Sequence, residues 1–552
     1  GLDALTANTT GDNNVVMGSL AMDANTTGSN NTALGYAALG ANTTAANNVA
    51  IGLNAMVANT TGASNVAVGN AALDANTTAS NNVAVGYTAL TANTTGAENV
   101  AIGWEANKGS TTGYSNIAIG YGVMNTGTNT GQYNIGMGRY SMQNLTSGDH
   151  NIGIGANTLD ALTGADNNIA IGNSALGANT TGAANTSVGN ESMTANTTGG
   201  SNTAIGGWAL AANTTASNNT AVGHFSGAAV TTGGNNVFVG QDSGKVLTTG
   251  TSNVFVGYQA GDAANCSHNV MIGLESLGAA ATGSSNVGVG NGSFASNTSG
   301  TFNVSVGHDS FGANTTGGSN TVVGYQALAA NTTASNNTAI GYQALNDNTT
   351  GDNNVAMGSY ALDANTTANS NIAIGVHALG GNTTGASNVA LGEDALKANT
   401  TSDDNTAIGK SALTANTTGA TNTAIGINAG KANTTGGYNV FLGRDAGITG
   451  SPGGNNTTGN GAIFLGDENI GTAHIQVDWT VASDARDKTD FTTLDLGLDF
   501  VKALAPVTYK WDKRSKYGDR KADDYDLNDQ TPDGTHKEDW LDIGFKAQEV
   551  EA

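Results

Sequence analysis

The stretch DWTVASDARDKTDF, residues 478–491, places a serine close to acidic and basic side chains. Ser483 is followed by Asp484, and Arg486 and Lys488 come shortly after. A serine hydroxyl is a weak nucleophile until a base removes its proton, and a lysine amine becomes such a base when burial lowers its pKa. Serine–lysine pairs are a known variant of the serine-protease solution. Spacing alone predicts such a pair only weakly, because serine and lysine occur this close together by chance in many proteins.

The chain before this stretch has a different composition. Glycine accounts for 80 of 552 residues and aromatic residues for 5%, too few large side chains for ordinary globular cores. Of the 60 Asp, Glu, Lys and Arg residues, 31 lie in residues 467–552. The three prolines are Pro452, Pro506 and Pro532. We therefore expect a boundary near residue 466.

Charge and cysteine content exclude several classes of protein. The net charge of −24 argues against a nucleic-acid partner, because no basic patch is present to neutralise phosphates. Cys266 is the only cysteine, so the chain cannot form an internal disulfide. No apolar run approaches the length of a membrane span and no signal peptide is present, so we expect no membrane insertion. Because Gly1 begins in the middle of a repeat, we expect a further N-terminal portion.

A repeated hexapeptide, x-Asn-[Val/Thr/Ile]-x-[hydrophobic]-Gly, dominates the sequence. It reads NNVVMG at 13–18, NNTALG at 30–35 and NNVAIG at 47–52, and its 26 copies run from Asn14 to Asn439. A second recurrent piece, ALxANTTG, lies between the hexapeptides. The regular array indicates a repeat architecture.

The step between copies is 17 residues almost everywhere. It is 18 residues from Asn116 to Asn134 and 16 from Asn253 to Asn269, and a worn copy, GAIFLG, closes the series at 461–466. Seventeen residues are too few for a helix pair or a propeller blade, but they suit one coil of a parallel β-solenoid with two short strands and two turns. At about 4.8 Å per coil, the array predicts a rod of about 125 Å.

The strand of each coil is expected to be apolar on both faces. Residues one and three after the Asn share a face because strand side chains alternate, and the residue between them is usually Ala, Gly or Ser. One face can line the interior of the coil, and the other needs a neighbour, which in a homo-oligomer is the same strand of another chain. The fixed Gly permits a turn, and stacked Asn residues can form side-chain ladders between coils.

The unit NNVAIGxxALxANTTG resembles the head repeats of YadA-like trimeric adhesins, although it is somewhat longer than the usual period of that family. The resemblance covers residues 1–466. It implies left-handed parallel β-rolls packed three together, and hence a homotrimeric rod.

The rod offers no convincing catalytic or metal site in its sequence. The Gly- and Asp-rich nonapeptide of calcium-binding β-rolls is missing, and we expect no metal and no cofactor. His150 and His268 each precede a repeat Asn, which fits an exposed turn. Glu393 and Asp394 could suggest glycan hydrolysis, but neighbours along a strand point to opposite faces, so solvated side chains are the simpler interpretation. NTT matches the glycosylation acceptor pattern, but its regular place favours turn chemistry. A Thr array that binds ice is a minor alternative.

Residues after the rod predict a small α+β domain. A half-buried strand is expected at 475–481, a helix at 494–505 that ends before a proline, and a second strand at 507–511. Residues 512–540 read as a charged loop or hairpin, and residues 542–552 as a short strand and the start of a helix.

The series SDARDK … VKALAPVTYKW … IGFKAQEVE resembles the C-terminal intramolecular chaperone domain of phage tailspikes and tail fibres, including endosialidases. The resemblance implies a domain that trimerises, guides folding of the preceding β-structure and then cuts its own chain. By this resemblance Ser483 is the nucleophile, Lys488 is the general base, and the cut falls between Ala482 and Ser483. Asp484 and Arg486 match the motif and would shape the site.

These features together predict three regions. Residues 1–443 form the β-roll shaft, residues 444–482 the worn coil and a connecting strand, and residues 483–552 the self-cleaving chaperone. The chaperone of that family continues past GFKAQEVE into a helical portion, so we expect the full domain to extend beyond Ala552.

We therefore predict a structural tail-fibre protein of a phage virion, located outside the cell. The shaft would be a homotrimer that adheres to the host surface through residues 444–482, and its partners would be a glycan or protein receptor and other tail proteins. Beyond a single autoproteolytic cut, no enzymatic turnover is expected. The alternatives are a trimeric adhesin on a bacterial surface, which predicts a C-terminal series of amphipathic strands not seen in residues 467–552, and a polysaccharide-degrading tailspike, which predicts clustered carboxylates on the coils.

Overall fold

A computed structural model describes residues 1–470, Thr472, residues 507–510, Thr531, Asp533, Thr535 and residues 542–544. The chain divides into two compact units, Gly1–Gly471 and Thr472–Ala552. Each unit is treated by itself below.

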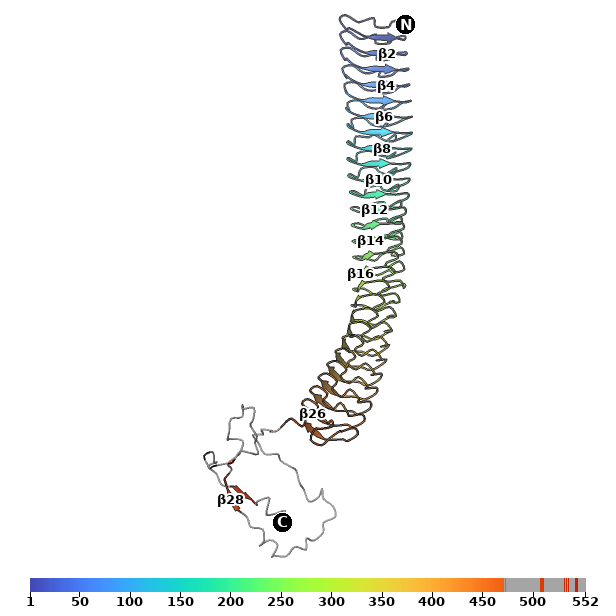
Figure 1. Cartoon of the computed structure of the whole chain (residues 1–552). Helices are drawn as coiled ribbons and strands as arrows, with labels where there is room; N and C mark the ends of the chain where they lie inside the picture. Colours follow the sequence, from blue (N-terminus) through green and yellow to red (C-terminus); the bar gives the residue numbers. More distant parts are fainter. Residues whose placement is uncertain are drawn as a thin grey trace. The chain divides into compact units, whose positions relative to one another are not determined.

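Unit 1, Gly1–Gly471, is a parallel β-solenoid whose coils stack along one axis (Figure 1). Its 27 strands form a single sheet, with each strand parallel to the strand of the next coil. They are β1 (Val15–Met17), β2 (Thr32–Leu34), β3 (Val49–Ile51), β4 (Val66–Val68), β5 (Val83–Val85), β6 (Val100–Ile102), β7 (Ile117–Ile119), β8 (Ile135–Met137), β9 (Ile152–Ile154), β10 (Ile169–Ile171), β11 (Thr186–Val188), β12 (Thr203–Ile205), β13 (Thr220–Val222), β14 (Val237–Val239), β15 (Val254–Val256), β16 (Val270–Ile272), β17 (Val287–Val289), β18 (Val304–Val306), β19 (Thr321–Val323), β20 (Thr338–Ile340), β21 (Val355–Met357), β22 (Ile372–Ile374), β23 (Val389–Leu391), β24 (Thr406–Ile408), β25 (Thr423–Ile425), β26 (Val440–Leu442) and β27 (Ile463–Leu465). The worn hexapeptide forms β27, so the expected solenoid of about 17 residues per coil is confirmed.

The rest of each coil runs as consecutive turns, and the second strand that we expected there is wrong. Ala37 and Leu39, in the piece that follows β2, have φ values of 52° and 54°, which a β-strand cannot adopt. The backbone still bonds from coil to coil in this part, since the N–H of Leu39 donates to the carbonyl of Ala55 at 3.0 Å. Burial of the leucine column compensates for its left-handed backbone.

Glycine at the end of each strand is required by both conformation and space. Gly52, for example, has a φ of 137°, and a Cβ added there would collide with the carbonyl of Gly69 in the next coil. The column of glycines therefore lets successive backbones approach closely at the corner that follows the sheet.

The interior is filled by the middle residue of each strand and by a second column on the turn side. Ala50 and Leu39 represent these two columns, and both are fully buried. Where the strand carries Phe238, the turn column carries Gly227, and a Cβ added at Gly227 would lie 2.7 Å from Phe238 Cδ2. The pattern reverses in the coil of Gly288, where the turn column carries Phe294. Volume is thus conserved coil by coil, as close packing requires.

Two ladders of asparagine side chains run through the solenoid, as expected. The repeat Asn forms an unbroken ladder, in which Asn48 Oδ1 accepts the backbone N–H of Asn65 at 2.9 Å and Asn48 Nδ2 donates to the Gly62 carbonyl at 3.0 Å. The Asn of NTT forms a second, interrupted ladder, in which Asn42 Nδ2 donates to Asn25 Oδ1 at 2.9 Å. Both ladders satisfy polar groups that would otherwise be buried without partners.

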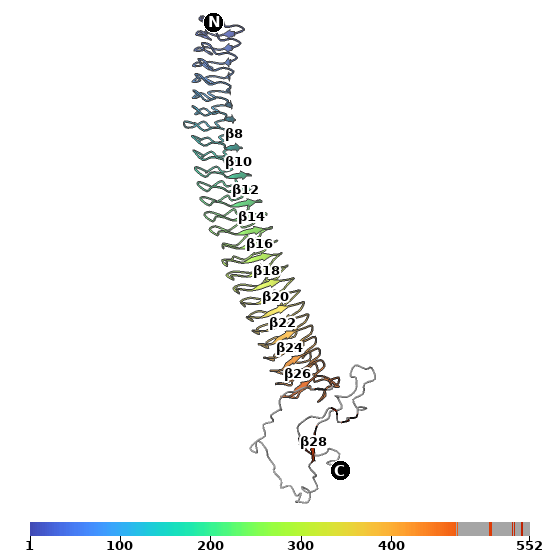
Figure 2. The same ribbon diagram turned by 90° about the vertical axis from the view of Figure 1, so that its left-hand side faces the viewer.

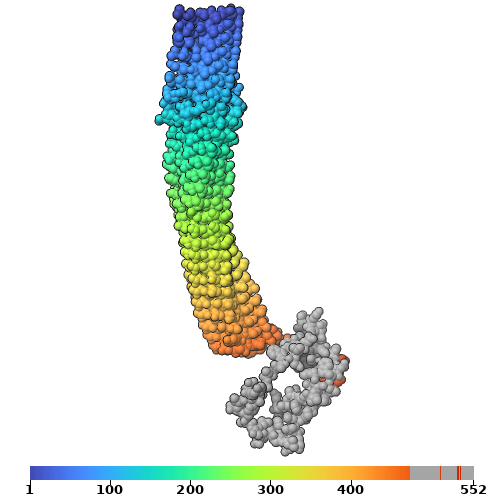
Figure 3. Space-filling model, turned by 180° about the vertical axis from the view of Figure 1, so that it is seen from behind, coloured from blue at the N-terminus to red at the C-terminus, as the bar shows by residue number. Residues whose placement is uncertain are grey.

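The rod formed by unit 1 is curved, most clearly in its C-terminal half (Figures 1 and 2). On the side seen in Figure 3 its surface is evenly filled from coil to coil.

The described part of unit 2 contains one antiparallel pair, β28 (Val507–Tyr509) with β29 (Asp542–Gly544). Both strands fall where strands were expected. The strand expected at 475–481 and the helix expected at 494–505 lie outside the described residues, so the α+β fold stays a prediction.

Candidate functional site

The expected autoprocessing residues, Ser483, Lys488, Ala482, Asp484 and Arg486, lie outside the described residues. Their chemistry therefore stays a prediction. Two features within unit 1 have the geometry of binding surfaces: the outward face of the sheet and a cavity beside the last coil.

The outward face of the sheet consists of four columns of side chains that run the length of unit 1. In the coil of β3 they are Asn47, Val49, Ile51 and Leu53, whereas Ala50 between them is fully buried. Alternation along the strand explains this arrangement. We call the column that precedes the repeat Asn the leading edge, and the column that follows the glycine the trailing edge.

The two central columns of this face are aliphatic and partly exposed. Ile51 is 37% exposed, and the equivalent position of most coils behaves in the same way. The residues with at least this exposure include Ile102, Met137, Ile154, Ile171, Ile205, Ile272, Met357, Leu391, Ile425 and Leu442. Exposed apolar surface that continues over so many coils exceeds what a monomeric protein normally shows, and it indicates an interface.

The two edges of the face carry stacked aromatic residues. On the trailing edge the ring centroids of Tyr87 and Trp104 lie 6.2 Å apart, and those of Trp104 and Tyr121 lie 4.5 Å apart. On the leading edge Tyr133 stacks on His150 with centroids 5.0 Å apart. Because the rings cover each other along the axis, they present mainly their edges to solvent. Such rows offer apolar contact at the flanks of the sheet.

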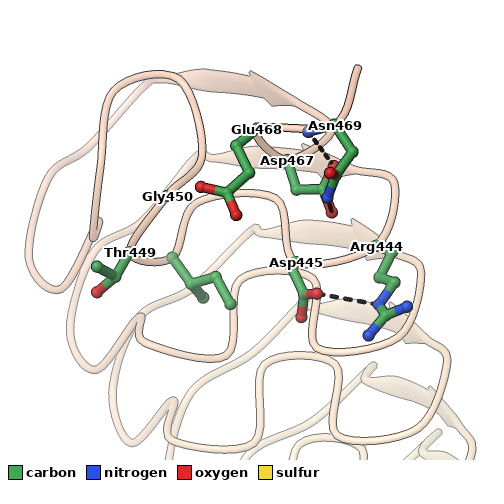
Figure 4. Close-up of a pocket in the computed structure, with 8 residues that line it drawn as sticks. Arg444, Asp445, Thr449, Gly450, Asp467, Glu468 and Asn469 are labelled. Atoms are coloured by element: carbon green, nitrogen blue, oxygen red, sulfur yellow. Dashed lines mark hydrogen bonds and ion pairs between the residues drawn. The ribbon is translucent and has the colours of Figure 1, made fainter. Parts of the chain in front are cut away.

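A cavity of about 300 Å³ lies beside the last coil, as drawn in Figure 4. It exists because 23 residues, not 17, separate Val440 of β26 from its partner Ile463 of β27. The extra residues form a longer loop on the turn side. The cavity is lined by Arg444, Asp445, Ile448, Thr449, Gly450, Asp467, Glu468 and Asn469.

The polar groups of this cavity are held by short contacts, as Figure 4 shows. Arg444 Nε donates to Asp445 Oδ2 at 3.0 Å. The side-chain amide and the backbone N–H of Asn469 donate to Asp467 at 3.1 and 2.9 Å, and these bonds lower the pKa of the Asp467 carboxyl. Glu468 lies against Gly450, where an added Cβ would be 2.9 Å from Glu468 Oε2. The cavity therefore presents one cation, fixed carboxylates and amide groups to a ligand.

The acidic pair Glu393 and Asp394 does not form a hydrolytic site. Glu393 Oε2 lies 2.8 Å from Lys410 Nζ, and Asp394 Oδ1 lies 2.9 Å from Lys397 Nζ. Each carboxylate thus has its own lysine at the surface, which agrees with the interpretation as solvated side chains.

The other residue types considered from the sequence take structural places. His150 and His268 are exposed and have φ values of 57° and 60°, as expected for turns. The Asn of NTT is fully buried, as at Asn42, and cannot accept a glycan there. Within the described part of the chain, no group of three His, Cys, Asp or Glu side chains could hold a metal ion. A search of the same residues found no helix long and apolar enough to cross a membrane.

Sequence reasoning missed the residues of the two edge columns and of the terminal cavity. The edge residues could have been found by reading the positions directly before the repeat Asn and directly after the repeat Gly. The cavity could not, because the enlarged gap before GAIFLG shows only that extra residues are present.

Comparison with known proteins gives one match. Residues 483–552 match the family model described as chaperone of endosialidase. Searches of curated proteins and of solved structures each found no match. The matched segment begins at Ser483, and together with the β-solenoid it fits a tail-fibre or endosialidase-type protein.

Proposed function

We propose that this chain is a structural fibre protein of a phage tail, displayed outside the cell on the virion. Unit 1 would form the shaft of a homotrimer, and residues 483–552 would direct trimer assembly and then release themselves. The mature fibre would adhere to a host-surface receptor and contact other tail proteins. The observation that carries the proposal is the combination of an uncovered aliphatic sheet face with a C-terminal chaperone match.

The sheet face supports association of identical chains. Full burial of one Val or Ile side chain contributes about 1.5–3 kcal/mol relative to exposure, and unit 1 has two such columns through 27 strands. The interface is repetitive, so identical chains can cover one another only if their coils match along the axis. Three chains around one axis bury the face of each in a closed ring.

A separate chaperone answers the folding problem of such a rod. Parallel pairing is slow, and each unassembled chain exposes strand edges and apolar surface that favour aggregation. A trimeric nucleus at one end would bring the chains together before the coils form. Removal of this nucleus afterwards would make assembly effectively irreversible.

Cleavage between Ala482 and Ser483 requires a balanced acyl transfer. Lys488 would accept the proton of Ser483 Oγ while this oxygen attacks the carbonyl carbon of Ala482. The amide nitrogen of Ser483 would gain a proton as the C–N bond breaks, which leaves an ester. Water would then hydrolyse the ester, so that Ala482 ends in a carboxylate and Ser483 begins with a free amine.

Mass spectrometry of the full-length protein tests the proteolytic part. We expect wild type to lose the mass of the segment that begins at Ser483, and Ser483→Ala and Lys488→Ala to stay intact. Ser515→Ala is the matched control and should cleave like wild type. Equal intact masses for wild type and Ser483→Ala would contradict self-cleavage, whereas light scattering independently tests the trimer.

We further propose that the terminal cavity contributes to receptor binding. Its mixture of carboxylates, an amide and a guanidinium suits the hydroxyl groups of a surface glycan. Glu468→Gln and Asn469→Ala should reduce adsorption to host cells, whereas Glu275→Gln, far along the rod, should not. Unchanged adsorption by both cavity variants would remove the support for this region.

A further inference from the structure

We propose that the trailing edge of one chain packs against the leading edge of its neighbour within the same coil, with no offset along the axis. This inference rests on the homotrimer proposed above and specifies how its chains contact each other. In a closed three-fold ring, each sheet face has one neighbour on either side, so unlike edges meet. The partner is therefore a second copy of this chain, and the argument comes from the charged and aromatic residues of the two edges.

Three residues of the trailing edge are basic: Arg139, Lys410 and Arg444. Each has a distinctive residue on the leading edge of its own coil. These are Tyr133, Asp404 and Tyr438 respectively, whereas most leading-edge positions hold Asn or Ser. A tyrosine ring attracts a guanidinium and a carboxylate attracts an ammonium, so all three pairs are complementary.

Within one chain these pairs cannot meet. The partners are six residues apart along a nearly extended segment, which spans about 20 Å. Both members of the pair at the last coil are strongly exposed, with Tyr438 at 72% and the side chain of Arg444 at 73%. Asp404 is also exposed, and no cation of the described residues forms an ion pair with it. The complementary groups are available to another chain.

An axial offset of one coil would destroy the complementarity. Lys410 would then face Ser387 or Thr421 in place of Asp404. Arg139 would face Ser115 or His150, and Arg444 would face Thr421 or Gly461. Only zero offset matches all three basic residues with a tyrosine or an acid.

The exposed phenylalanine of the leading edge adds independent support. Phe302 is 67% exposed, and the trailing edge of its coil carries His308, which begins the aromatic stack with Tyr325 at 5.6 Å. Zero offset therefore also places the most exposed apolar ring of this edge beside an aromatic row of the neighbouring chain.

Disulfide trapping tests the register. Asp404→Cys combined with Lys410→Cys should, on oxidation, give a covalent trimer on a denaturing gel. A control pair, Asp404→Cys with Arg444→Cys, lies two coils out of register, about 10 Å along the axis, and exceeds the reach of about 7 Å between Cα atoms. Each single variant should stay uncrosslinked. Cys266 does not interfere, because it is buried and its pKa is raised to about 11.

The outcomes separate this inference from the trimer itself. A trimer by light scattering in which the control pair crosslinks, or in which Asp404→Cys with Lys410→Cys does not, overturns the register and leaves the trimer standing. A monomer by light scattering overturns both. Crosslinking that never passes the dimer contradicts three-fold closure.

A double-mutant cycle gives a second readout without new bonds. Asp404→Asn and Lys410→Gln should each lower the melting temperature, and the double variant should lower it by less than the sum. Asp404→Asn with Lys397→Gln is the control and should be additive. Additivity in both cycles would contradict contact between Asp404 and Lys410 of neighbouring chains.

Discussion

Asn213 donates its Nδ2 to Asn196 Oδ1 at 2.8 Å, yet its own Oδ1 has no donor within the described residues. The reason is that the next coil places Val230 in the ladder. In every run of this ladder, each amide donates back to the preceding coil, so the last carbonyl oxygen is left over. The same holds for Asn93 and Asn433, which end the other two runs. The interrupted ladder is therefore directional, and its cost falls at its C-terminal ends.

Removal of an amide should cost more inside a run than at its end. Asn348 Oδ1 accepts from Asn365 Nδ2 at 2.8 Å and from the Gly351 N–H at 3.2 Å, two bonds for which Asn213 has no equivalent. We expect Asn348→Ala to destabilise the local coils by about 2 kcal/mol more than Asn213→Ala, at about 1 kcal/mol per bond. Hydrogen exchange of the neighbouring coils would measure this difference. Equal protection in both variants would contradict the directional ladder.

The exchange of volume between the two interior columns predicts a rescue. Gly244→Leu should destabilise unit 1, because the new side chain collides with the ring of Phe238. The left-handed backbone is not the obstacle, since Leu39 and Leu73 occupy the same place in other coils at 54° and 55°. Phe238→Ala alone should cost about 3–5 kcal/mol through its cavity, and the double variant should be more stable than either single variant. Denaturant midpoints check this, and a double variant weaker than both would sink the idea.

Cys266 should resist alkylation in the folded protein. Burial raises the pKa of its thiol to about 11, so almost no thiolate is present near pH 8. The raised pKa contributes stability at a pH below the ordinary thiol value, and this contribution is lost as pH rises toward 11. Labelling with iodoacetamide, followed by mass spectrometry, should show slow reaction in native protein and rapid reaction in denaturant. Rapid labelling of the native protein would contradict the burial.

Asp160 should reduce stability at neutral pH. Burial raises the pKa of its carboxyl, so folding favours the protonated form. The stabilising contribution of protonation is complete below the ordinary carboxyl value and is lost as pH rises through the raised pKa. Asp160→Asn should therefore raise the melting temperature at pH 7, with the gain shrinking toward pH 3. The exposed control Asp12→Asn should change little, and a loss of stability in Asp160→Asn would refute the assignment.

The sequence predicts the solenoid well because its period and its alternation arise from local backbone geometry. The Asn at each strand start and the Gly at each strand end mark every coil, including the worn one at β27. The turn side was harder. ALxANTTG contains good strand and helix formers, and only tertiary packing shows that Leu39 adopts a left-handed backbone. Local propensity therefore misled where long-range stacking decides.

The candidate sites differ in how far the sequence reaches. The Ser483 and Lys488 pair rests on motif resemblance, and its family match begins at Ser483. The edge pairs could have been read from the repeat, since Asp404 and Lys410 hold fixed positions in it. The terminal cavity depends on how a longer loop folds beside Glu468, which no periodicity encodes.

The departures from a 17-residue step have an implication for how such a fibre evolves. The coil that needs 18 residues, between Asn116 and Asn134, still pairs these two side chains at 3.1 Å, and the 23-residue coil still aligns Val440 with Ile463. Additions are absorbed on the turn side while the interchain face stays in phase. Duplication or loss of whole units would therefore lengthen or shorten the fibre like a telescoping ruler, without redesign of either end.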